Sequence, residues 1–571
     1  MKKIRFGTPE KIVPTAFCKN LNYTESDVKY DYGKIKFKTT ARGCLVEFPV
    51  EKDEQIYGFG LQLKGFNHKG RKLCLRTNSD PVAYTGDSHA PIPFFVTTKG
   101  YGMYFDTARY IEAYCGYNRK RGRMDSGKTK VGLNTDEIYK VGEQTETSTM
   151  LVQIPASKGI DIYIFEGDTI TDIVSQYNMF SGGGCDVPDW GFEVLYRAYA
   201  EYNQDKVAEL ADFFRQNDYE VGIIGLEPGW QTNSYSCSYV WDKERFPTPD
   251  KLIKELREKN YHINLWEHAF TSAAAPFYKE MMPYCGEFEV WRGIVPDFAT
   301  KEARKIFADY HSNYLVKHGI DGFKLDECDS SDYVSHWSFP NCAEFPSGMD
   351  GEQYHQLFGI LYMQAILEAL GQTKTLSEVR SAGALAASYP FVLYSDLYNH
   401  RDFIRGVANS GFSGILWTPE LRDAKSKDEF LRRLQTTVFS AQCVVNAWYC
   451  PEVPWKDLDC ENEVKELFKT RKALIPILKR AFEDYKETGK PPVRALVADY
   501  TDDCETYRID DEYIFCDDMI VAPIMVGETG RRVYLPKGNW IDYWTKEPVE
   551  PGWFDVKTDK IPVYEKTKEQ R

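Results

Sequence analysis

Short runs of alternating hydrophobic and polar residues fill the first third of the chain. Runs such as 35–38 and 45–48 alternate with a period of two, and Gly, Asn, Asp and Pro separate them. This alternation is typical of half-buried strands, and many short strands are economically arranged as two packed sheets. We therefore expect residues 1–185 to form an N-terminal β-sandwich.

The period changes after Pro188. Strand-like apolar runs now alternate with helix-like runs, at 192–197, 206–216, 221–226, 251–259 and 262–266. Such alternation indicates βαβ units and a parallel sheet. Polar or aromatic clusters follow the strands, as in the catalytic loops of a (β/α)8 barrel, whereas the Gly-rich turn of a doubly wound sheet is missing. The pattern predicts an α/β fold with a (β/α)8 TIM barrel over residues 186–485.

Strand-like runs return near the end of the chain, at 519–524 and 532–536. They predict a small C-terminal β-sandwich over residues 486–571, packed on the barrel. A chain of 571 residues is too long for one hydrophobic core, which agrees with three domains.

Charge and composition limit the classes of molecule that the protein is expected to bind. The formal net charge is -14 at pH 7 and the sequence pI is about 5.4, whereas nucleic acid and anionic membrane surfaces attract basic proteins. Twelve Trp and 38 Tyr favour a sugar, because flat rings match the apolar faces of pyranoses. We expect a small-molecule or oligosaccharide substrate, with no nucleic acid and no membrane. An oligomer is possible, but the sequence does not reveal the oligomeric state.

The location and the cofactors are predicted from what the sequence lacks. The basic start is followed by no apolar stretch, and no window of eighteen residues is apolar throughout, so we expect neither a signal peptide nor a membrane span. The 14 Cys show no paired spacing, which is typical of reduced thiols in a cytoplasmic protein. No CxxC or His-rich cluster indicates a metal, and no cofactor is expected.

The stretch 319–329 is the strongest candidate for chemistry. A short apolar run there ends abruptly in acidic residues, which predicts a buried strand with Asp326 at the barrel mouth. Lys324 points to the same side, because strand side chains alternate. The alternative is that Asp326, Glu327 and Asp329 are solvated loop carboxylates. Two carboxylates facing one site suffice for glycoside hydrolysis, so Asp326 would need a partner elsewhere.

Several motifs resemble glycoside hydrolase family 31, a family of mostly retaining α-glycosidases, and they occur in the family's order. Asp321-Gly322-Phe323-Lys324-Leu325-Asp326 resembles the nucleophile strand. The other matching segments are 241–247, 291–298, 521–523 and 534–540. The resemblance spans nearly the whole chain and implies a catalytic barrel with flanking sandwiches.

The resemblance also implies residue roles. It makes Asp326 the nucleophile, Asp396 the acid/base and Arg380 a substrate contact. Tyr-Ser before Asp396 departs from the family's pattern, so Glu420 and Asp423 remain competing candidates for the acid/base. Asp326 must be ionised and Asp396 protonated, so their surroundings should push their pKa values apart.

Further substrate contacts are expected at the strand ends. Glu420 stands where the family has a sugar-binding Asp, and Asn446 stands where it has a His. The remaining candidates are Glu227, Trp230, Trp266, His268, Trp291, Lys324, Trp417 and Trp448. Each of the aromatic residues has an alternative role in the core.

The predicted function is a retaining, exo-acting α-glycosidase that works by double displacement. The departures at Glu420 and Asn446 favour an α-galactosidase. An α-glucosidase, an α-xylosidase or a transglycosylase of the same family remains open. Two further alternatives are a non-catalytic carbohydrate-binding protein on a barrel scaffold and a metal-dependent barrel hydrolase, for which nine scattered His provide few ligands.

Overall fold

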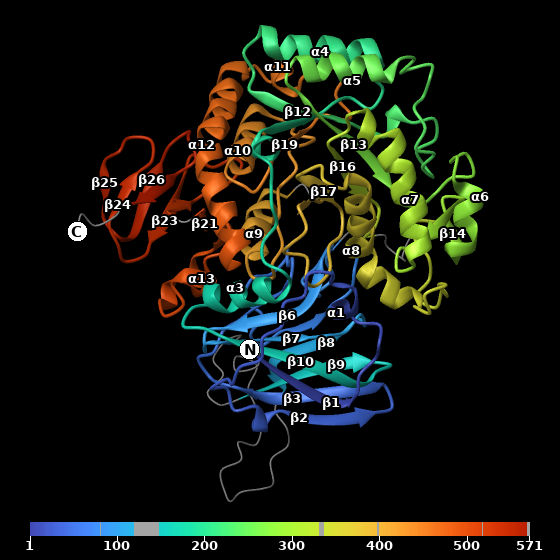
Figure 1. The fold of residues 1–571 in the computed structure, drawn as a ribbon. Coiled ribbons are helices and arrows are strands. Elements are labelled where there is room, and N and C mark those ends of the chain that lie inside the picture. The colour runs from blue at the N-terminus through green and yellow to red at the C-terminus, as the bar shows by residue number, and fades with distance from the viewer. Residues whose placement is uncertain (80, 119–147, 330–335, 397–398, 517, 568–571) are drawn as a thin grey trace, which may run out of the picture.

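The computed structural model describes residues 1–79, 81–118, 148–329, 336–396, 399–516 and 518–567. Figure 1 shows a central barrel of strands inside a ring of helices, with one sheet-rich region beneath it and another at its side. This arrangement confirms the predicted fold class.

The N-terminal region consists of two five-stranded sheets. The first sheet has the order β1 (Lys2–Thr8), β10 (Lys158–Glu166), β7 (Tyr101–Phe105), β6 (Pro91–Thr97) and β4 (Ile56–Gly60). The second sheet has the order β2 (Lys36–Thr40), β3 (Gly43–Val50), β9 (Ser148–Pro155), β8 (Glu112–Asn118) and β5 (Lys72–Cys74). Their facing side chains form a separate buried core, which includes Val46, Phe95 and Ile162. The helix α3 (Ile170–Phe180) packs against β6 and β7 on the side of the barrel (Figure 1).

The barrel contains seven regular parallel strands in chain order around its wall. They are β11 (Val194–Arg197), β12 (Val221–Leu226), β13 (His262–His268), β16 (Gly322–Asp326), β17 (Ser377–Val379), β18 (Phe391–Leu393) and β19 (Cys443–Asn446). The surrounding helices include α4 (Gln204–Gln216), α5 (Pro249–Glu258), α7 (Lys301–Tyr314), α8 (Gly351–Leu370), α9 (His400–Ser410), α10 (Lys427–Val438) and α12 (Glu461–Thr488). A hairpin of β14 (Cys285–Val290) and β15 (Gly293–Pro296) is inserted after β13.

The segment 415–421 closes the barrel as an irregular eighth strand. Leu393 of β18 forms a parallel bridge with Trp417, and Leu421 forms a second parallel bridge with Val445 of β19. Pro419 lies between the two bridges and has no N–H to donate, which explains why the ladder is interrupted.

Side chains alternate between the barrel interior and the helices. Leu195, Ile223 and Val444 form a small cluster that is separate from the main core. Two positions after Leu195 on β11, the side chain of Arg197 also points into the barrel. Gly225 leaves room for it, since a Cβ on Gly225 would lie 2.9 Å from the Arg197 Cγ. The interior therefore changes from apolar to charged toward the carboxyl ends of the strands.

The C-terminal region has a six-stranded sheet and a two-stranded sheet, which lie beside α12 in Figure 1. The strands of the first are β20 (Val493–Ala495), β21 (Tyr513–Phe515), β22 (Met519–Val521), β27 (Val563–Lys566), β24 (Trp540–Asp542) and β25 (Pro548–Val549). The second pairs β23 (Gly530–Leu535) with β26 (Gly552–Lys557). Helix α12 ends at Thr488, so the predicted limit at residue 485 falls in its last turn. The domain limits stay a prediction. Within the described part of the chain, no helix combines the length and apolarity that a membrane span requires.

Candidate active site

A layer of buried charges crosses the barrel below its mouth. The Arg197 Nη1 donates to Glu227 Oε1 at 3.0 Å, and its Nη2 donates to Asn264 Oδ1 at 2.9 Å and also pairs with Glu378. These groups come from four different strands or strand ends, and all of them are buried. Removing one partner of such a pair leaves an uncompensated buried charge, which costs roughly 3–5 kcal/mol.

Lys324 extends this layer toward the last strands. Its Nζ donates to Glu420 Oε1 at 2.8 Å and lies 3.9 Å from Glu227 Oε1. The predicted residues Glu227, Lys324 and Glu420 are therefore brought together. The second oxygen of Glu420, Oε2, is buried and has no hydrogen-bond partner.

Asp326 ends β16 at the mouth of the barrel, and two donors orient it. The Trp266 Nε1 donates to Asp326 Oδ2 at 2.7 Å, and the Glu327 backbone N–H donates to Oδ1 at 2.9 Å. Burial opposes ionisation of Asp326, but the charges of Arg380 and Lys324 outweigh it and hold its pKa below the usual value. With 14% of its side chain exposed, this carboxylate is oriented, ionised and accessible.

Arg380 bridges the two aspartates that the sequence singles out. Its Nη1 donates to Asp396 Oδ2 at 2.6 Å and lies 3.8 Å from Asp326 Oδ1. The two carboxylate oxygens can be no farther apart than these distances added together. This limit, which applies to one oxygen of each carboxylate, accommodates the ~5–5.5 Å separation of retaining glycosidases. The Arg380 Nε donates to Asp329 Oδ2 at 2.9 Å, so this guanidinium is largely occupied by carboxylates.

Asp396 is also held by a second guanidinium, that of Arg422. Burial would raise the pKa of Asp396, but the charges of Arg380 and Arg422 outweigh burial and lower it. This differs from the expectation that the two aspartates have pKa values pushed apart, because both pKa values are lowered. The reason is the second arginine. The Asp396 side chain is 38% exposed and accessible from outside.

Glu327, the residue after Asp326, has a raised pKa. Burial, together with the negative charge of Asp326, raises its pKa well above the usual range. The Tyr235 hydroxyl donates to Glu327 Oε1 at 3.3 Å. Glu327 adopts a φ of +57°, an uncommon backbone conformation for a residue with a side chain.

Aromatic side chains gather on the β13 side of Asp326. The ring of Tyr235 lies 5.5 Å from Trp266, 5.3 Å from His268 and 4.9 Å from Trp291. The Trp291 ring in turn lies 5.9 Å from Trp337. Burial lowers the pKa of His268 to about 3, so this imidazole is neutral. Three of the predicted aromatic residues, Trp266, His268 and Trp291, thus meet next to Asp326.

Two predicted contacts lie elsewhere. Trp230 is buried, and its Nε1 donates to the backbone oxygen of Trp266 at 2.7 Å, so it supports the wall from behind. The Trp417 Nε1 would lie 2.8 Å from a Cβ on Gly406, so this ring packs against α9 outside the barrel. Trp417 lies three positions before Glu420, and strand side chains alternate, so the Trp417 ring points to the opposite side from Glu420.

Asn446 and Trp448 carry buried polar atoms without a partner at the strand ends. The Asn446 Nδ2 and the Trp448 Nε1 have no hydrogen-bond partner, as is also true of Glu420 Oε2. Together these three atoms offer two donors and one acceptor, which the hydroxyl groups of a ligand can pair with. The competing acid/base candidate Asp423 is exposed beside this group.

Sequence reasoning missed the residues that support the aspartates. The His89 Nδ1 pairs with Asp329 Oδ2 at 2.5 Å, and its Nε2 is hydrogen-bonded to the Ser395 Oγ at 2.7 Å. His89 precedes β6 of the N-terminal sandwich, and no periodicity connects it with the barrel. Arg422 could have been found, since it follows Glu420 by two positions and therefore faces the same side.

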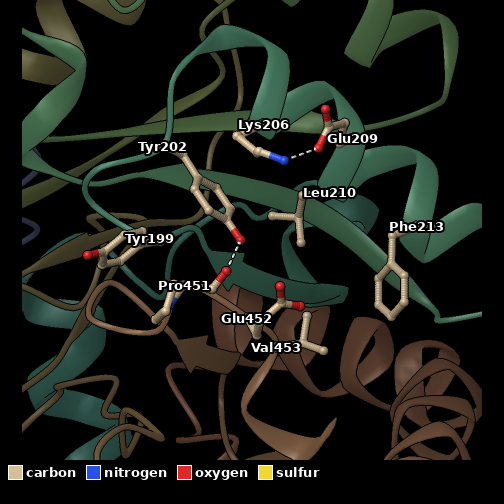
Figure 2. Close-up of a pocket in the computed structure, with 9 residues that line it drawn as sticks. All are labelled: Tyr199, Tyr202, Lys206, Glu209, Leu210, Phe213, Pro451, Glu452 and Val453. Carbon is tan, nitrogen blue, oxygen red and sulfur yellow. Dashed lines mark hydrogen bonds and ion pairs between the residues drawn. The ribbon is translucent and has the colours of Figure 1, made fainter.

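The described residues contain no group of three or more His, Cys, Asp or Glu side chains that could hold a metal ion. A separate cavity of about 470 Å³ lies between α4 and the loop after β19 (Figure 2). None of the predicted site residues lines it. Its polar groups pair with one another, as Lys206 does with Glu209 at 2.6 Å and Tyr202 with the Pro451 oxygen at 2.7 Å.

Three family models match consecutive parts of the chain. They are the glycosyl hydrolase 31 N-terminal galactose mutarotase-like domain at residues 20–112, the glycosyl hydrolases family 31 TIM-barrel domain at 185–481 and the glycosyl hydrolase family 31 C-terminal domain at 489–568.

Named relatives are similar over most of the chain. An alpha-glucosidase of Saccharolobus solfataricus is 24% identical, with 91% of this chain and 79% of the relative covered. An alpha-xylosidase of Emericella nidulans is 20% identical, with 91% and 67% covered. The cycloalternan-forming enzyme from Listeria monocytogenes, solved in complex with a pentasaccharide substrate, has the same fold with a TM-score of 0.77 and 20% identity. That match covers 92% of this chain but only 53% of the other, so this chain spans about half its length.

Proposed function

We propose that this protein, which belongs to glycoside hydrolase family 31, is a retaining, exo-acting α-glycosidase that uses Asp326 and Asp396 as its catalytic pair. The observation that carries the proposal is the position of the Arg380 Nη1 between the two carboxylates, within 3.8 Å of one and 2.6 Å of the other. An arginine shared by both carboxylates keeps them close enough for the ~5–5.5 Å separation that a covalent glycosyl-enzyme requires.

In the proposed mechanism, Asp326 attacks the anomeric carbon while Asp396 protonates the departing oxygen. The charges of Arg380 and Lys324 and the Trp266 N–H favour the ionised form of Asp326 that attack requires. Asp396 must take up a proton before it acts as the acid, and its two guanidinium partners oppose this. Substrate binding must therefore weaken one of these pairs. In the second step water attacks the anomeric carbon, Asp396 takes up the proton of that water, and the bond from the sugar to Asp326 breaks.

The terminal sugar is proposed to lie over the charge layer. Glu420 Oε2 is an acceptor, whereas Asn446 Nδ2 and Trp448 Nε1 are donors, and all three are buried and unpaired. Sugar hydroxyls both donate and accept, so one ring could satisfy the three atoms. A hydrophobic ligand would leave them unsatisfied, at about 1–3 kcal/mol each.

For the sugar itself, we favour an α-glucoside or an α-xyloside over an α-galactoside. The two relatives named above are an alpha-glucosidase and an alpha-xylosidase, which supports the alternative in the sequence prediction better than its main choice. Initial rates with the 4-nitrophenyl α-glycosides of glucose, xylose and galactose test this. The glucoside or xyloside should give the highest kcat/KM, and a dominant galactoside would overturn the choice.

A non-catalytic carbohydrate-binding protein is the remaining alternative of another class. Asp326→Asn should abolish turnover of the best substrate while leaving the fold intact, as seen by thermal unfolding. Unchanged turnover would remove Asp326 from the mechanism. Transfer of the sugar to an acceptor other than water, a cytoplasmic location and the absence of nucleic-acid binding stay predictions.

A further inference from the structure

Glu327 lies one residue beyond Asp326 and belongs neither to the charge layer nor to the pairs that Arg380 and Arg422 form with the two aspartates. Its backbone N–H orients Asp326 at 2.9 Å, while its side chain reaches the hydroxyl of Tyr235, 3.3 Å from Oε1. A carboxyl adjacent to the attacking group, on the aromatic side of the mouth, has no task in the displacement described above. It does have hydrogen-bonding capacity left for a ligand.

The aromatic cluster that Glu327 contacts through Tyr235 changes from buried to exposed. Trp266 is 1% exposed and His268 is fully buried, whereas Tyr235 is 48% and Trp337 43% exposed. In an exo-acting site the terminal sugar occupies the buried end and the leaving group extends toward solvent. Tyr235 and Trp337 therefore lie on the leaving-group side, and Glu327 joins that side through its contact with Tyr235.

The chemistry of this rim fits a sugar. Exposed aromatic faces pack against the apolar faces of a pyranose, and a carboxyl beside them hydrogen-bonds its hydroxyls. Burial and the charge of Asp326 raise the pKa of Glu327, so this carboxyl holds a proton and has both a donor and an acceptor to offer. An aryl leaving group would use the aromatic faces but not the carboxyl.

We propose that Glu327, with Tyr235 and Trp337, binds a hydroxylated leaving group, so that Glu327 determines the preference for a sugar over an aryl leaving group. The proposal rests on the proposed glycosidase function and deepens it. It assigns Glu327 to recognition of the leaving group and not to proton transfer or to attack.

Two variants separate the hydrogen bonds from the shape of the side chain. Glu327→Gln keeps an acceptor and supplies N–H donors, so it should resemble the neutral carboxyl. Glu327→Leu removes both. Each variant is assayed on a disaccharide and on the 4-nitrophenyl glycoside of the same terminal sugar, and the ratio of the two kcat/KM values is compared with that of the wild type. Tyr235→Phe, which frees Glu327 from its anchor, provides a third and milder change.

The ratio of disaccharide to aryl kcat/KM should fall about tenfold in Glu327→Leu, the loss expected for one or two hydrogen bonds. It should stay within about threefold in Glu327→Gln and fall less in Tyr235→Phe than in Glu327→Leu. Glu452→Leu, on the separate cavity of Figure 2, is the matched control and should leave the ratio unchanged.

An unchanged ratio in Glu327→Leu, or an equal loss on both substrates, would overturn the assignment while leaving the glycosidase proposal standing. If Glu327→Leu fails to fold, a tenfold fall of the ratio in Glu327→Gln would contradict the neutral-carboxyl argument, and an unchanged ratio in Tyr235→Phe would overturn the anchoring by Tyr235. A wild-type protein that cleaves no α-glycoside of either kind would instead refute the proposed function, and this inference with it.

Discussion

Replacing Arg422 by Gln should move the alkaline limb of the pH–rate profile upward. Arg422 is one of two guanidinium groups that pair with Asp396 and lower its pKa. A hydrogen bond to a charged group contributes about 1.5–3 kcal/mol, and one pKa unit corresponds to about 1.4 kcal/mol. Losing Arg422 should therefore raise the pKa of Asp396 by about 1–2 units. The protonated acid then persists to higher pH, so activity on poor leaving groups extends in that direction.

The assay is kcat/KM against pH with a phenyl α-glycoside, whose poor leaving group depends on the acid, because kcat/KM reports the free enzyme. Arg401→Gln is the control, since the Arg401 guanidinium pairs with Asp510 and Asp511 of the C-terminal region and its loss should leave the profile in place. An alkaline limb that stays fixed or moves downward in Arg422→Gln would refute the assignment of Asp396 as the acid.

Three further changes test the surroundings of the site. Trp266→Phe removes the N–H bond to Asp326 and should lower kcat/KM by roughly tenfold to a hundredfold, the value of a hydrogen bond to a charged group; a loss under threefold in steady-state kinetics would contradict its orienting role. Arg197→Met leaves Glu378 buried without its partner, and the free energy of unfolding measured in urea should fall by about 3–5 kcal/mol. The double variant with Glu378→Leu should recover part of that loss. No recovery would show that the broken pair is not the cause. Burial lowers the pKa of His68 from 6.5 to about 4, so the unfolded chain takes up a proton that the folded protein excludes; stability is retained above about pH 6.5 and should fall by up to about 3 kcal/mol as the pH drops to 4. His68→Gln should flatten that dependence, and an equal slope in variant and wild type would contradict the linkage.

The alternation of strand side chains predicted much of the site. Applied to β16, it placed Lys324 and Asp326 on one side, and the structure places both inside the barrel. The same rule would have favoured Arg422 over Trp417 on the eighth strand. The sequence predicted a strand there but not which of its side chains face inward, because Pro419 interrupts the ladder and the apolar run is short.

The remaining features depend on contacts between distant parts of the chain. His89 reaches Asp329 from another domain, 240 positions away, and no local pattern records such a contact. The lowered pKa of Asp396 arises from Arg380 and Arg422, which precede and follow it by 16 and 26 positions. A pKa reflects the summed interactions with all nearby charges. The sequence therefore indicated the two carboxylates, but its expectation of a protonated Asp396 did not include the second arginine.

The central claim is that Asp326 forms a covalent bond with the sugar. Incubation with a 5-fluoro-α-glycosyl fluoride of the preferred sugar, followed by proteolysis and mass spectrometry, tests it directly. The account predicts a single glycosylated peptide with the label on Asp326, and accumulation of that label should match the loss of activity. A label on Asp396, Glu327 or Glu420, or inactivation without any glycosylated carboxylate, would contradict it.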